Sequence, residues 1–376
     1  MQNSIPVRDE YSDYEVEELI GAVLSKESRE RFTNVKERIS YGKRIFDAMR
    51  RLDVIQPYIE DPEVTEIMVN GPDHIYIEKQ GRLQKTDTTF ESSQRLEDVI
   101  QQIVGTVNRT VNEANPIVDA RLEDGSRVNA VLPPVALNGP ILTIRKFREE
   151  PISMDELIQW GTISEEAAGF LERCVQERYN LFICGGTASG KTTLLNILGT
   201  FIPKEERIIT IEDAAELQLK SLDNLVTLET RKPNVEGKGE ITIRDLIRTS
   251  LRMRPNRIIV GEIRGAEALD MLQAMNTGHD GSLSTGHANS CVDMISRIES
   301  MVLQGVTFPV EAIRAQIASA IDLMVFVSHR PDGRRWVMEI DQIRGMKEGQ
   351  VEMEPIFLRE DGELVRTEYP FYEKKI

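Results

Sequence analysis

The chain has 376 residues, of which 40% are hydrophobic. Because a single hydrophobic core usually stops growing before this length, we expect two domains. The 46 basic and 62 acidic residues give a net charge of -16, which excludes a protein that grips nucleic acid along much of its surface and leaves room only for a local basic patch.

The cysteines and the lack of long apolar stretches indicate where the protein works. Cys174, Cys184 and Cys291 lack the C-x-x-C spacing of zinc sites, so we expect them to be reduced and buried, with no zinc bound. No apolar stretch approaches the about 18 residues that span a bilayer, and the first residues do not resemble a signal peptide. We therefore expect a soluble protein that reaches a membrane only through a partner.

Residues 1–58 are predicted to form a helical N-terminal region. Apolar residues such as Ile20, Ile45 and Met49 recur at helical spacing among many charges. The acidic cluster at residues 9–18 is most simply a solvated face of this region, and a docking tail is the alternative.

Residues 59–147 are predicted to form an α/β domain. An amphipathic stripe of apolar residues predicts a helix from 96 to 107 that packs on a sheet. An Asn-Gly-Pro-Asp turn after residue 69 predicts a hairpin within that sheet. The predicted strands lie at residues 64–69, 74–78, 127–132 and 140–147.

A charged connector, residues 148–155, is predicted to separate this domain from a second one, residues 156–376. Strand and helix character alternate in the second domain, which predicts a mostly parallel sheet covered by helices, as in P-loop NTPases. The predicted strands lie at residues 179–184, 207–211, 257–261, 282–285 and 323–327.

Residues 185–192 match the whole phosphate-loop motif GxxxxGK[ST] and lie between an apolar strand and an apolar helix. The glycines let successive backbone N–H groups turn toward phosphate oxygens. Lys191 adds a positive charge for the terminal phosphates, and the Thr192 hydroxyl is placed to hold Mg²⁺. A simple glycine-rich turn would leave this Lys-Thr pair unexplained. The predicted nucleotide-binding residues are Gly185, Gly186, Thr187, Ala188, Ser189, Gly190, Lys191, Thr192 and Thr193.

Carboxylates follow two later strands, at the edge where parallel α/β sheets bind ligands. A carboxylate beside Mg²⁺ can orient and polarise the attacking water, so Glu262 is our first choice for a catalytic residue. Glu212 is the second choice, and it is also a candidate for Mg²⁺ binding, directly or through water. A helix cap or a surface ion pair is the structural alternative, above all for Asp213 and Glu216.

Two of the four histidines, His279 and His287, lie close together in the sequence. Neither has another histidine four residues away, so no zinc is expected there. His287 is predicted to donate a hydrogen bond toward the γ-phosphate, and a structural loop histidine is the alternative.

Four motifs, in this order, resemble the Walker A, aspartate box, Walker B and histidine box of the ATPases that drive type II and type IV secretion and type IV pili. They are GGTASGKT from residue 185, IEDAAE from residue 211, RMRPNRIIVGEIR from residue 252 and STGHANS from residue 284. The segments DGSRVNAVLPP from residue 124 and LDMLQAMNTGHDGS from residue 269 look most like the CpaF/TadA branch, which assembles tight-adherence (Flp) pili. The resemblance covers roughly residues 60–330 and is far more specific than one phosphate loop.

The resemblance implies a hexameric ring motor with a PAS-like N-terminal α/β domain and a RecA-like ATPase domain that uses ATP and Mg²⁺. In the family, arginines of the N-terminal domain close over the phosphates. Arg127 and Arg145 stand at matching positions here, and Arg121 is a weaker candidate. A guanidinium fork suits the charge on phosphoryl oxygens, although each arginine could instead form an interdomain ion pair.

The chain departs from the family pattern at two positions. Asn256 stands where an acid usually precedes the Walker B strand, which puts a secondary polar contact in doubt but leaves Glu262 intact. Gly286 stands in the histidine box where this branch often has a bulkier residue. The tetracysteine zinc site of some relatives is absent from the sequence.

The resemblance implies that ATP hydrolysis around the ring moves an inner-membrane platform protein and thereby pilin subunits. The implied process is pilus assembly, and pilus retraction is left open. We expect a cytoplasmic protein, peripheral at the inner face of the membrane through partners, with no direct nucleic-acid contact. A conjugation-type motor for DNA or effector export is the alternative, which the acidic composition disfavours. A nucleotide-binding scaffold without turnover is a third class, and the intact Lys191, Thr192, Glu262 and His287 argue against it.

Overall fold

The computed structural model describes residues 11–31, 34–79, 81–106, 110–122, 124–147, 151–233 and 237–373. The chain divides into two compact units, Met1–Glu149 and Glu150–Ile376. Each unit combines helices with its own sheet, and the predicted α/β fold class is confirmed. Within the described residues, no helix has both the length and the apolar character needed to cross a membrane.

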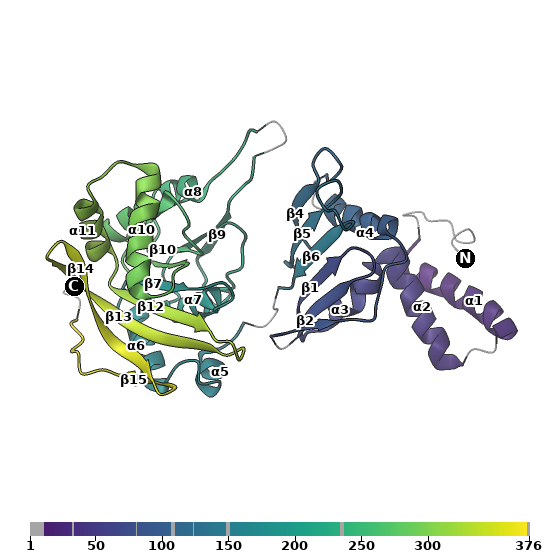
Figure 1. Ribbon diagram of the computed structural model, residues 1–376, viewed down its shortest axis with the longest axis horizontal. Helices are drawn as coiled ribbons and strands as arrows, with labels where there is room; N and C mark the ends of the chain where they lie inside the picture. The colour runs from purple at the N-terminus through teal and green to yellow at the C-terminus, as the bar shows by residue number, and fades with distance from the viewer. Residues whose placement is uncertain are drawn as a thin grey trace. The chain divides into compact units, whose positions relative to one another are not determined.

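The N-terminal unit begins with helices. These are α1 (Asp13–Arg31), α2 (Val35–Arg50), the short 3₁₀ helix η2 (Asp53–Ile55) and α3 (Gln56–Glu60). Asn34 and Glu37 form a capping box that satisfies backbone N–H groups at the start of α2. Val16 and Ile20 of α1 are buried with Phe46 of α2 in a small apolar cluster, so the two helices pack as a pair (Figure 1).

A six-stranded antiparallel sheet follows, in the order β3-β2-β1-β6-β5-β4. Its strands are β1 (Val64–Asn70), β2 (Ile75–Lys79), β3 (Arg82–Lys85), β4 (Ile117–Arg121), β5 (Arg127–Val131) and β6 (Ile141–Arg145). The predicted hairpin is present as β1 and β2, and the predicted amphipathic helix is α4 (Ser93–Thr106). Leu96, Ile100 and Ile103 of α4 are buried against the sheet in the core of this unit.

The second unit is built on a nine-stranded sheet, in the order β15-β14-β13-β12-β7-β11-β10-β8-β9. Six strands are parallel: β7 (Leu181–Gly185), β8 (Ile208–Glu212), β9 (Leu225–Glu229), β10 (Arg257–Val260), β11 (Leu283–Gly286) and β12 (Leu323–His329). Three more extend the sheet in antiparallel fashion: β13 (Arg335–Lys347), β14 (Gln350–Glu360) and β15 (Glu363–Arg366). The mostly parallel sheet was predicted, but β9 and the antiparallel strands were not.

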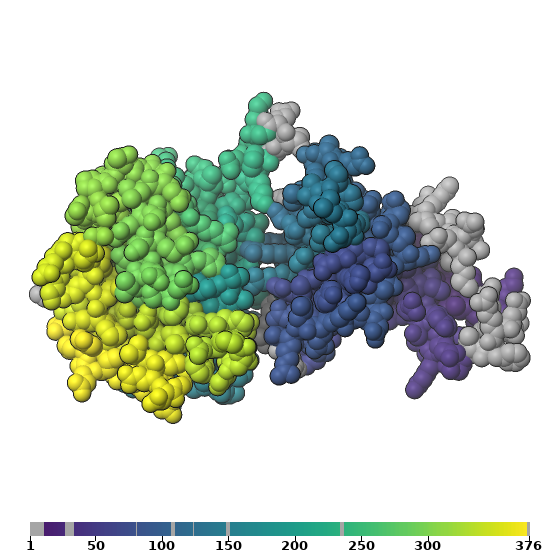
Figure 2. All heavy atoms as spheres, viewed as in Figure 1, coloured from purple at the N-terminus to yellow at the C-terminus, as the bar shows by residue number. Residues whose placement is uncertain are grey.

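Helices cover both faces of this sheet. They are α5 (Met154–Gln159), α6 (Glu165–Gln176), α7 (Lys191–Gly199), α8 (Ile243–Ser250), α9 (Glu267–Asn276), α10 (Cys291–Gly305) and α11 (Val310–Ala320). One apolar cluster joins the sheet to α6 and α7, and another joins it to α8 through α11. In the space-filling view, β13–β15 (yellow) lie along the surface of this unit next to α10 (green) (Figure 2). Helix α5 begins inside the segment that we predict as a linker, of which residues 148–150 lie outside the described part.

A buried ion pair joins β10 to the turn before β8. Arg257 is fully buried, and its Nε and Nη2 donate to the two carboxylate oxygens of Glu206 at 2.6 and 2.9 Å. A third bond runs from Nη1 to the carbonyl oxygen of Val175 at the end of α6. Because a buried charge is costly unless it is paired, this pair fixes the N-terminal end of β10 relative to its neighbours.

Candidate nucleotide site

The candidate site lies at one edge of the parallel sheet. β7, β11, β10 and β8 are consecutive parallel neighbours. Their C-terminal ends therefore meet at the same edge, where ligands bind in parallel α/β sheets. The phosphate loop follows β7, Glu212 ends β8, Glu262 follows β10 and His287 follows β11.

The phosphate loop is shaped by its glycines and by tight contacts at its base. Gly190 adopts a left-handed conformation with φ of 98° directly before α7, and Ala188 adopts one with φ of 56°. A Cβ at Gly185 would lie 2.2 Å from the carbonyl oxygen of Val327 and 2.6 Å from Oγ of Ser189, so only glycine fits there. The loop therefore has a fixed curved conformation, and its backbone N–H groups lie at the start of α7.

The side chains of this loop divide into buried and accessible ones. Ser189 and Lys191 are buried, whereas Gly186, Thr187 and Ala188 are exposed. Thr192 and Thr193 are half-buried in the first turn of α7. The Ser189 hydroxyl is buried and has no hydrogen-bond partner within the described residues.

Lys191, His287 and Glu262 form a chain of polar contacts across the site. Nζ of Lys191 donates to the carbonyl oxygen of Gly186 at 2.8 Å and lies 3.3 Å from Nδ1 of His287. Nε2 of His287 lies 3.0 Å from Oε1 of Glu262. Three of the predicted residues, drawn from three separate motifs, are thus brought together by the fold.

The surroundings of His287 favour its neutral form. Burial lowers the pKa of His287, and the positive charges of Lys191 and Arg264 lower it further, while Glu262 opposes them. The net effect places this pKa below the ordinary value of a histidine. A neutral imidazole between a cation and a carboxylate can donate one hydrogen bond and accept another.

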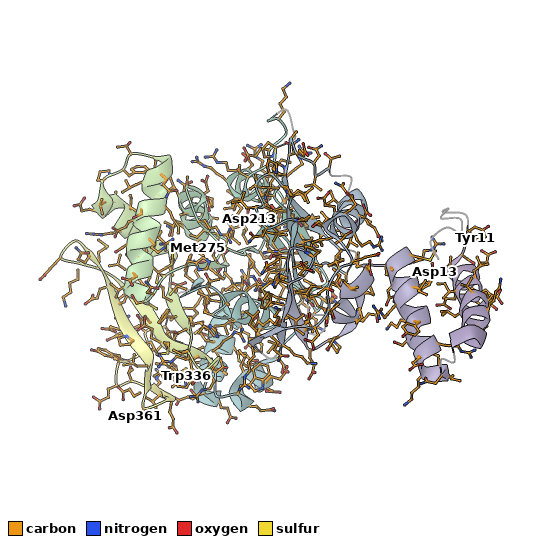
Figure 3. The ribbon with its side chains drawn as sticks, turned by 45° about the vertical axis from the view of Figure 1, so that its right-hand side comes forward. Tyr11, Asp13, Asp213, Met275, Trp336 and Asp361 are labelled. Atoms are coloured by element: carbon orange, nitrogen blue, oxygen red, sulfur yellow. The ribbon has the colours of Figure 1, made fainter. Side chains whose placement is uncertain are left out.

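Arg264 is a site residue that we did not predict. Its Nη2 donates to Oε2 of Glu262 at 2.8 Å, and its Nη1 lies 3.6 Å from Oδ2 of Asp213. Asp213, which is labelled in Figure 3, follows β8. The Glu262 side chain is only 20% exposed and is held from one side by His287 and from the other by Arg264. The sequence signal that could have identified Arg264 is its position two residues after Glu262, the acid at the end of a predicted strand.

Glu212 is held by the loop that follows β8. Its Oε1 accepts hydrogen bonds from the backbone N–H groups of Glu216 at 2.9 Å and Leu217 at 3.2 Å. The side chain is buried and close to Gly261, because a Cβ there would lie 2.9 Å from Cγ of Glu212. These contacts give Glu212 a structural role in shaping the site edge, and Mg²⁺ binding by Glu212 stays a prediction.

The residues fit a nucleoside triphosphate with a divalent cation. The loop offers backbone N–H groups, the Lys191 ammonium, the Thr192 hydroxyl and a buried Ser189 hydroxyl that lacks a partner within the described residues. Such donors match phosphate oxygens, and hydroxyl and carboxylate oxygens match Mg²⁺.

The predicted arginines of the N-terminal unit lie in one row. Arg121 of β4 is directly opposite Arg127 of β5, which is directly opposite Arg145 of β6. Arg145 in turn is opposite Glu66 of β1, and its Nε lies 3.8 Å from Oε1 of that residue. Opposite residues of antiparallel strands share a face of the sheet, so three guanidinium groups line one face.

Comparisons with known proteins place the chain in a family. Residues 49–331 match the model of a family described as type II/IV secretion system protein. The chain belongs to the type II/IV secretion system protein family. A relative in Mycobacterium tuberculosis, named "Putative conjugal transfer protein", is 36% identical over 305 residues, which cover 80% of this chain and 86% of that protein.

Two further proteins resemble the chain, one in sequence and one in fold. The type IV secretion system protein VirB11 of Brucella suis is 31% identical over 312 residues, covering 76% of this chain and 86% of that protein. A crystal structure of the pilus retraction motor PilT with bound ADP superposes with a TM-score of 0.55 at 20% identity, covering 85% and 83% of the two chains. The latter likeness supports the fold, and the predicted resemblance to secretion ATPases is confirmed.

The two departures of this family member have structural explanations. Oδ1 of Asn256 accepts a hydrogen bond from the backbone N–H of Arg207 at 2.8 Å and so joins the starts of β10 and β8. A Cβ at Gly286 would lie 2.8 Å from Cε of Met294 and 3.1 Å from Cε1 of Phe182. A side chain at Gly286 would therefore require the end of the Met294 side chain on α10 to shift.

Proposed function

We propose that this secretion-family protein is an ATP hydrolase that couples hydrolysis to the movement of macromolecules across or within the cell envelope. The observation that carries the proposal is the chain of contacts from Lys191 through His287 to Glu262 at the phosphate-loop edge of the sheet. Membership of the type II/IV secretion system protein family supports it, and so does the relative named as the type IV secretion system protein VirB11.

Each residue has a distinct task in the proposed hydrolysis. The loop N–H groups and Lys191 bind the β- and γ-phosphates. The Glu262 carboxylate, oriented by His287 and Arg264, positions a water for attack and polarises it. Neutral His287 donates toward the γ-phosphate when nucleotide separates it from Glu262 or Lys191.

Thr192 and Glu212 are the proposed holders of Mg²⁺, Glu212 directly or through water. When bound, this cation supplies charge neutralisation on the phosphate oxygens. Arg127 and Arg145 are proposed to supply positive charge from the face of the N-terminal sheet, where the row of guanidinium groups suits an anion.

We propose assembly of a type IV or tight-adherence pilus, with retraction left open, as the process that is driven. The CpaF/TadA-like segments support this choice, and so does the net charge of -16. A conjugation-type motor for DNA or effector export is a second candidate, because the relatives from Mycobacterium tuberculosis and Brucella suis carry conjugal-transfer and type IV secretion names. In either case the proposed active form is a homohexamer in the cytoplasm, bound to an inner-membrane platform protein.

Steady-state ATP hydrolysis as a function of protein concentration tests the chemistry. We expect activity that rises steeply with concentration, as ring assembly requires, and that is lost in Lys191→Ala and Glu262→Gln. Glu262→Gln should still bind ATP, because it leaves the loop intact. The matched control is Asp213→Asn, another acid in contact with Arg264, which should keep most of the activity. Equal activity in Glu262→Gln and the natural protein would refute the role of Glu262.

Deletion of the gene in its host separates the two processes. Loss of surface pili with normal DNA transfer would support the pilus, and the reverse would support conjugation. Tight ATP binding without turnover by the purified protein, together with normal pili and normal DNA transfer in the deletion strain, would favour a scaffold.

A further inference from the structure

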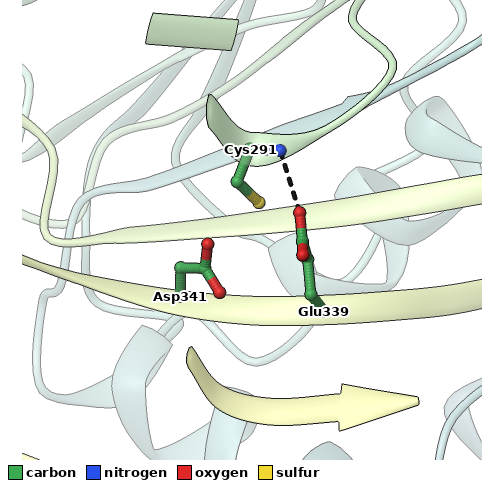
Figure 4. Close-up of side chains that lie close together, drawn as sticks. All are labelled: Cys291, Glu339 and Asp341. Carbon is green, nitrogen blue, oxygen red and sulfur yellow. Dashed lines mark hydrogen bonds between the residues drawn. The ribbon is translucent and has the colours of Figure 1, made fainter. Parts of the chain in front are cut away.

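A second polar cluster lies beneath the N-terminus of α10, away from the residues assigned above. Cys291 is the first residue of α10, and Glu339 and Asp341 are two residues apart on β13. One potential ligand atom from each of these three side chains lies within 4.8 Å of the other two. Figure 4 shows the Cys291 sulfur and the Asp341 carboxylate directed toward the same space, with the Glu339 carboxylate beside it.

The cluster consists of ionisable groups next to an apolar core. Cys291 is fully buried and Asp341 is only 6% exposed. Oε1 of Glu339 accepts a hydrogen bond from the backbone N–H of Cys291 at 2.9 Å, but Oδ1 of Asp341 is buried with no hydrogen-bond partner within the described residues. A buried carboxylate oxygen without a partner is costly, so its presence points to a missing positively charged partner.

The charges around these groups are of one sign. Burial, and next the charge of Glu339, raises the pKa of Asp341 to about 7, while a hydrogen bond from the Cys291 side chain acts in the opposite direction. Burial also raises the pKa of the Cys291 thiol, and neighbouring Cys184, Asp341 and Glu339 raise it further. A cation among the three groups would relieve this repulsion and allow all of them to ionise.

We propose that Cys291, Glu339 and Asp341 bind one Zn²⁺ ion. A thiolate with two carboxylates suits zinc, which accepts sulfur and oxygen ligands and takes four of them, so a water would be the fourth ligand. Mg²⁺ and Ca²⁺ take oxygen ligands instead. Binding releases the thiol proton of Cys291 and the carboxyl proton of Asp341 to solvent. Glu339 is half-buried and is the most accessible of the three ligands.

The position of the cluster gives the ion a structural task. Cys291 comes four residues after His287, and β13 belongs to the antiparallel part of the sheet. Zinc would therefore link the end of the loop that carries His287 to β13. The proposal stands independently of nucleotide hydrolysis, because it rests on none of the residues that we assign to ATP.

The proposal replaces our expectation of no zinc. That expectation rested on the spacing of cysteines and histidines, whereas the two carboxylates lie about 50 residues further along the chain, where no local motif marks them.

Metal analysis of the untagged full-length protein, purified without chelators, tests the proposal. We expect one zinc per chain by mass spectrometry. After exchange for Co²⁺, we expect a near-ultraviolet thiolate-to-cobalt charge-transfer band at one equivalent. This measurement on the natural protein needs no variant, and the absence of both zinc and the band would overturn the proposal.

Variants then assign the site. Cys291→Ser and the isosteric Asp341→Asn should each lower Co²⁺ affinity at least about tenfold, since loss of even an outer-shell partner of a metal ligand typically weakens binding about 10- to 100-fold. The matched control is Cys174→Ser, a buried cysteine in the other apolar cluster, which should keep the band. A band that survives in folded Cys291→Ser, or one that Cys174→Ser abolishes, would refute the assignment.

Discussion

Arg127 lies directly opposite Arg145 on two neighbouring antiparallel strands of the N-terminal sheet. Like charges in this position repel each other and slightly destabilise a sheet. We expect this row to serve an anion, because guanidinium groups suit phosphoryl oxygens. Substitution of these arginines can therefore distinguish a phosphate-binding role from a structural one.

Replacement of either arginine by alanine should lower ATP hydrolysis and leave stability intact. We expect kcat to fall by about 100-fold or more, because arginines that contact transferring phosphoryl groups contribute at least this much. The free energy of unfolding should fall by no more than about 1 kcal/mol, because ion pairs of exposed side chains such as Arg145 and Glu66 contribute little. Arg82→Ala, at an exposed position in β3, is the control for general effects on the domain. Loss of stability with unchanged kcat would instead identify a structural arginine.

The protonation of His287 should be visible by NMR of labelled imidazoles. Its pKa is lowered by burial, Lys191 and Arg264, so the neutral form should persist as pH falls below the ordinary histidine pKa of about 6.5. Glu262→Gln removes the charge that raises this pKa, so the midpoint should fall further. His287→Gln identifies the signal among the four histidines. A midpoint above 6.5 in the natural protein, or a rise in Glu262→Gln, would contradict the geometry.

Gly185 and Gly186 should differ sharply in their tolerance of alanine. A Cβ at Gly185 meets a carbonyl oxygen at 2.2 Å, whereas a Cβ at Gly186 meets nothing within 4 Å. We expect Gly185→Ala to lower the free energy of unfolding by about 3 kcal/mol, at the upper end for overpacking. Gly186→Ala should change it by less than about 1 kcal/mol. Denaturant unfolding of the two variants measures the difference, and equal stabilities would show that the base of the loop can expand.

The buried pair of Glu206 and Arg257 should contribute to stability at neutral pH. Glu206→Gln leaves Arg257 buried without its counter-charge, so we expect a loss of about 3–5 kcal/mol. Burial alone would raise the pKa of Glu206, but hydrogen bonds to Arg257 and the charge of Arg257 outweigh it and hold this pKa below its ordinary value. The stabilisation is therefore present above the unfolded-state pKa of about 4.3 and is lost as pH falls through the lower folded-state value.

Unfolding of Glu206→Gln and the natural protein across acid pH measures this dependence. The gap between their stabilities should narrow as the pH falls below about 4. Asp332→Asn, which breaks the exposed pair with Arg334, is the control and should leave stability unchanged. A gap that stays constant down to low pH would show that the charge of Glu206 is not what stabilises the pair.

The phosphate loop and the parallel strands could be predicted because their information is local. The glycines, Lys191 and Thr192 act within one short turn, and the apolar runs of β7, β8 and β10 reflect strands buried on both faces. The four ordered motifs were enough to indicate the family, which the family model then showed. The antiparallel strands after residue 334 escaped prediction, because their half-buried residues carry a weaker pattern.

The contacts within the site depended on the tertiary structure. Lys191 and His287 are 96 residues apart, and only the order of β7 and β11 in the sheet brings them together. The registers of β4, β5 and β6 place three arginines in one row, and the register of β13 brings Glu339 and Asp341 to Cys291. Sequence by itself determined which chemical groups the protein carries and the local turns that hold them. The pairing of distant strands decided which groups meet, because that pairing depends on the packing of the whole core.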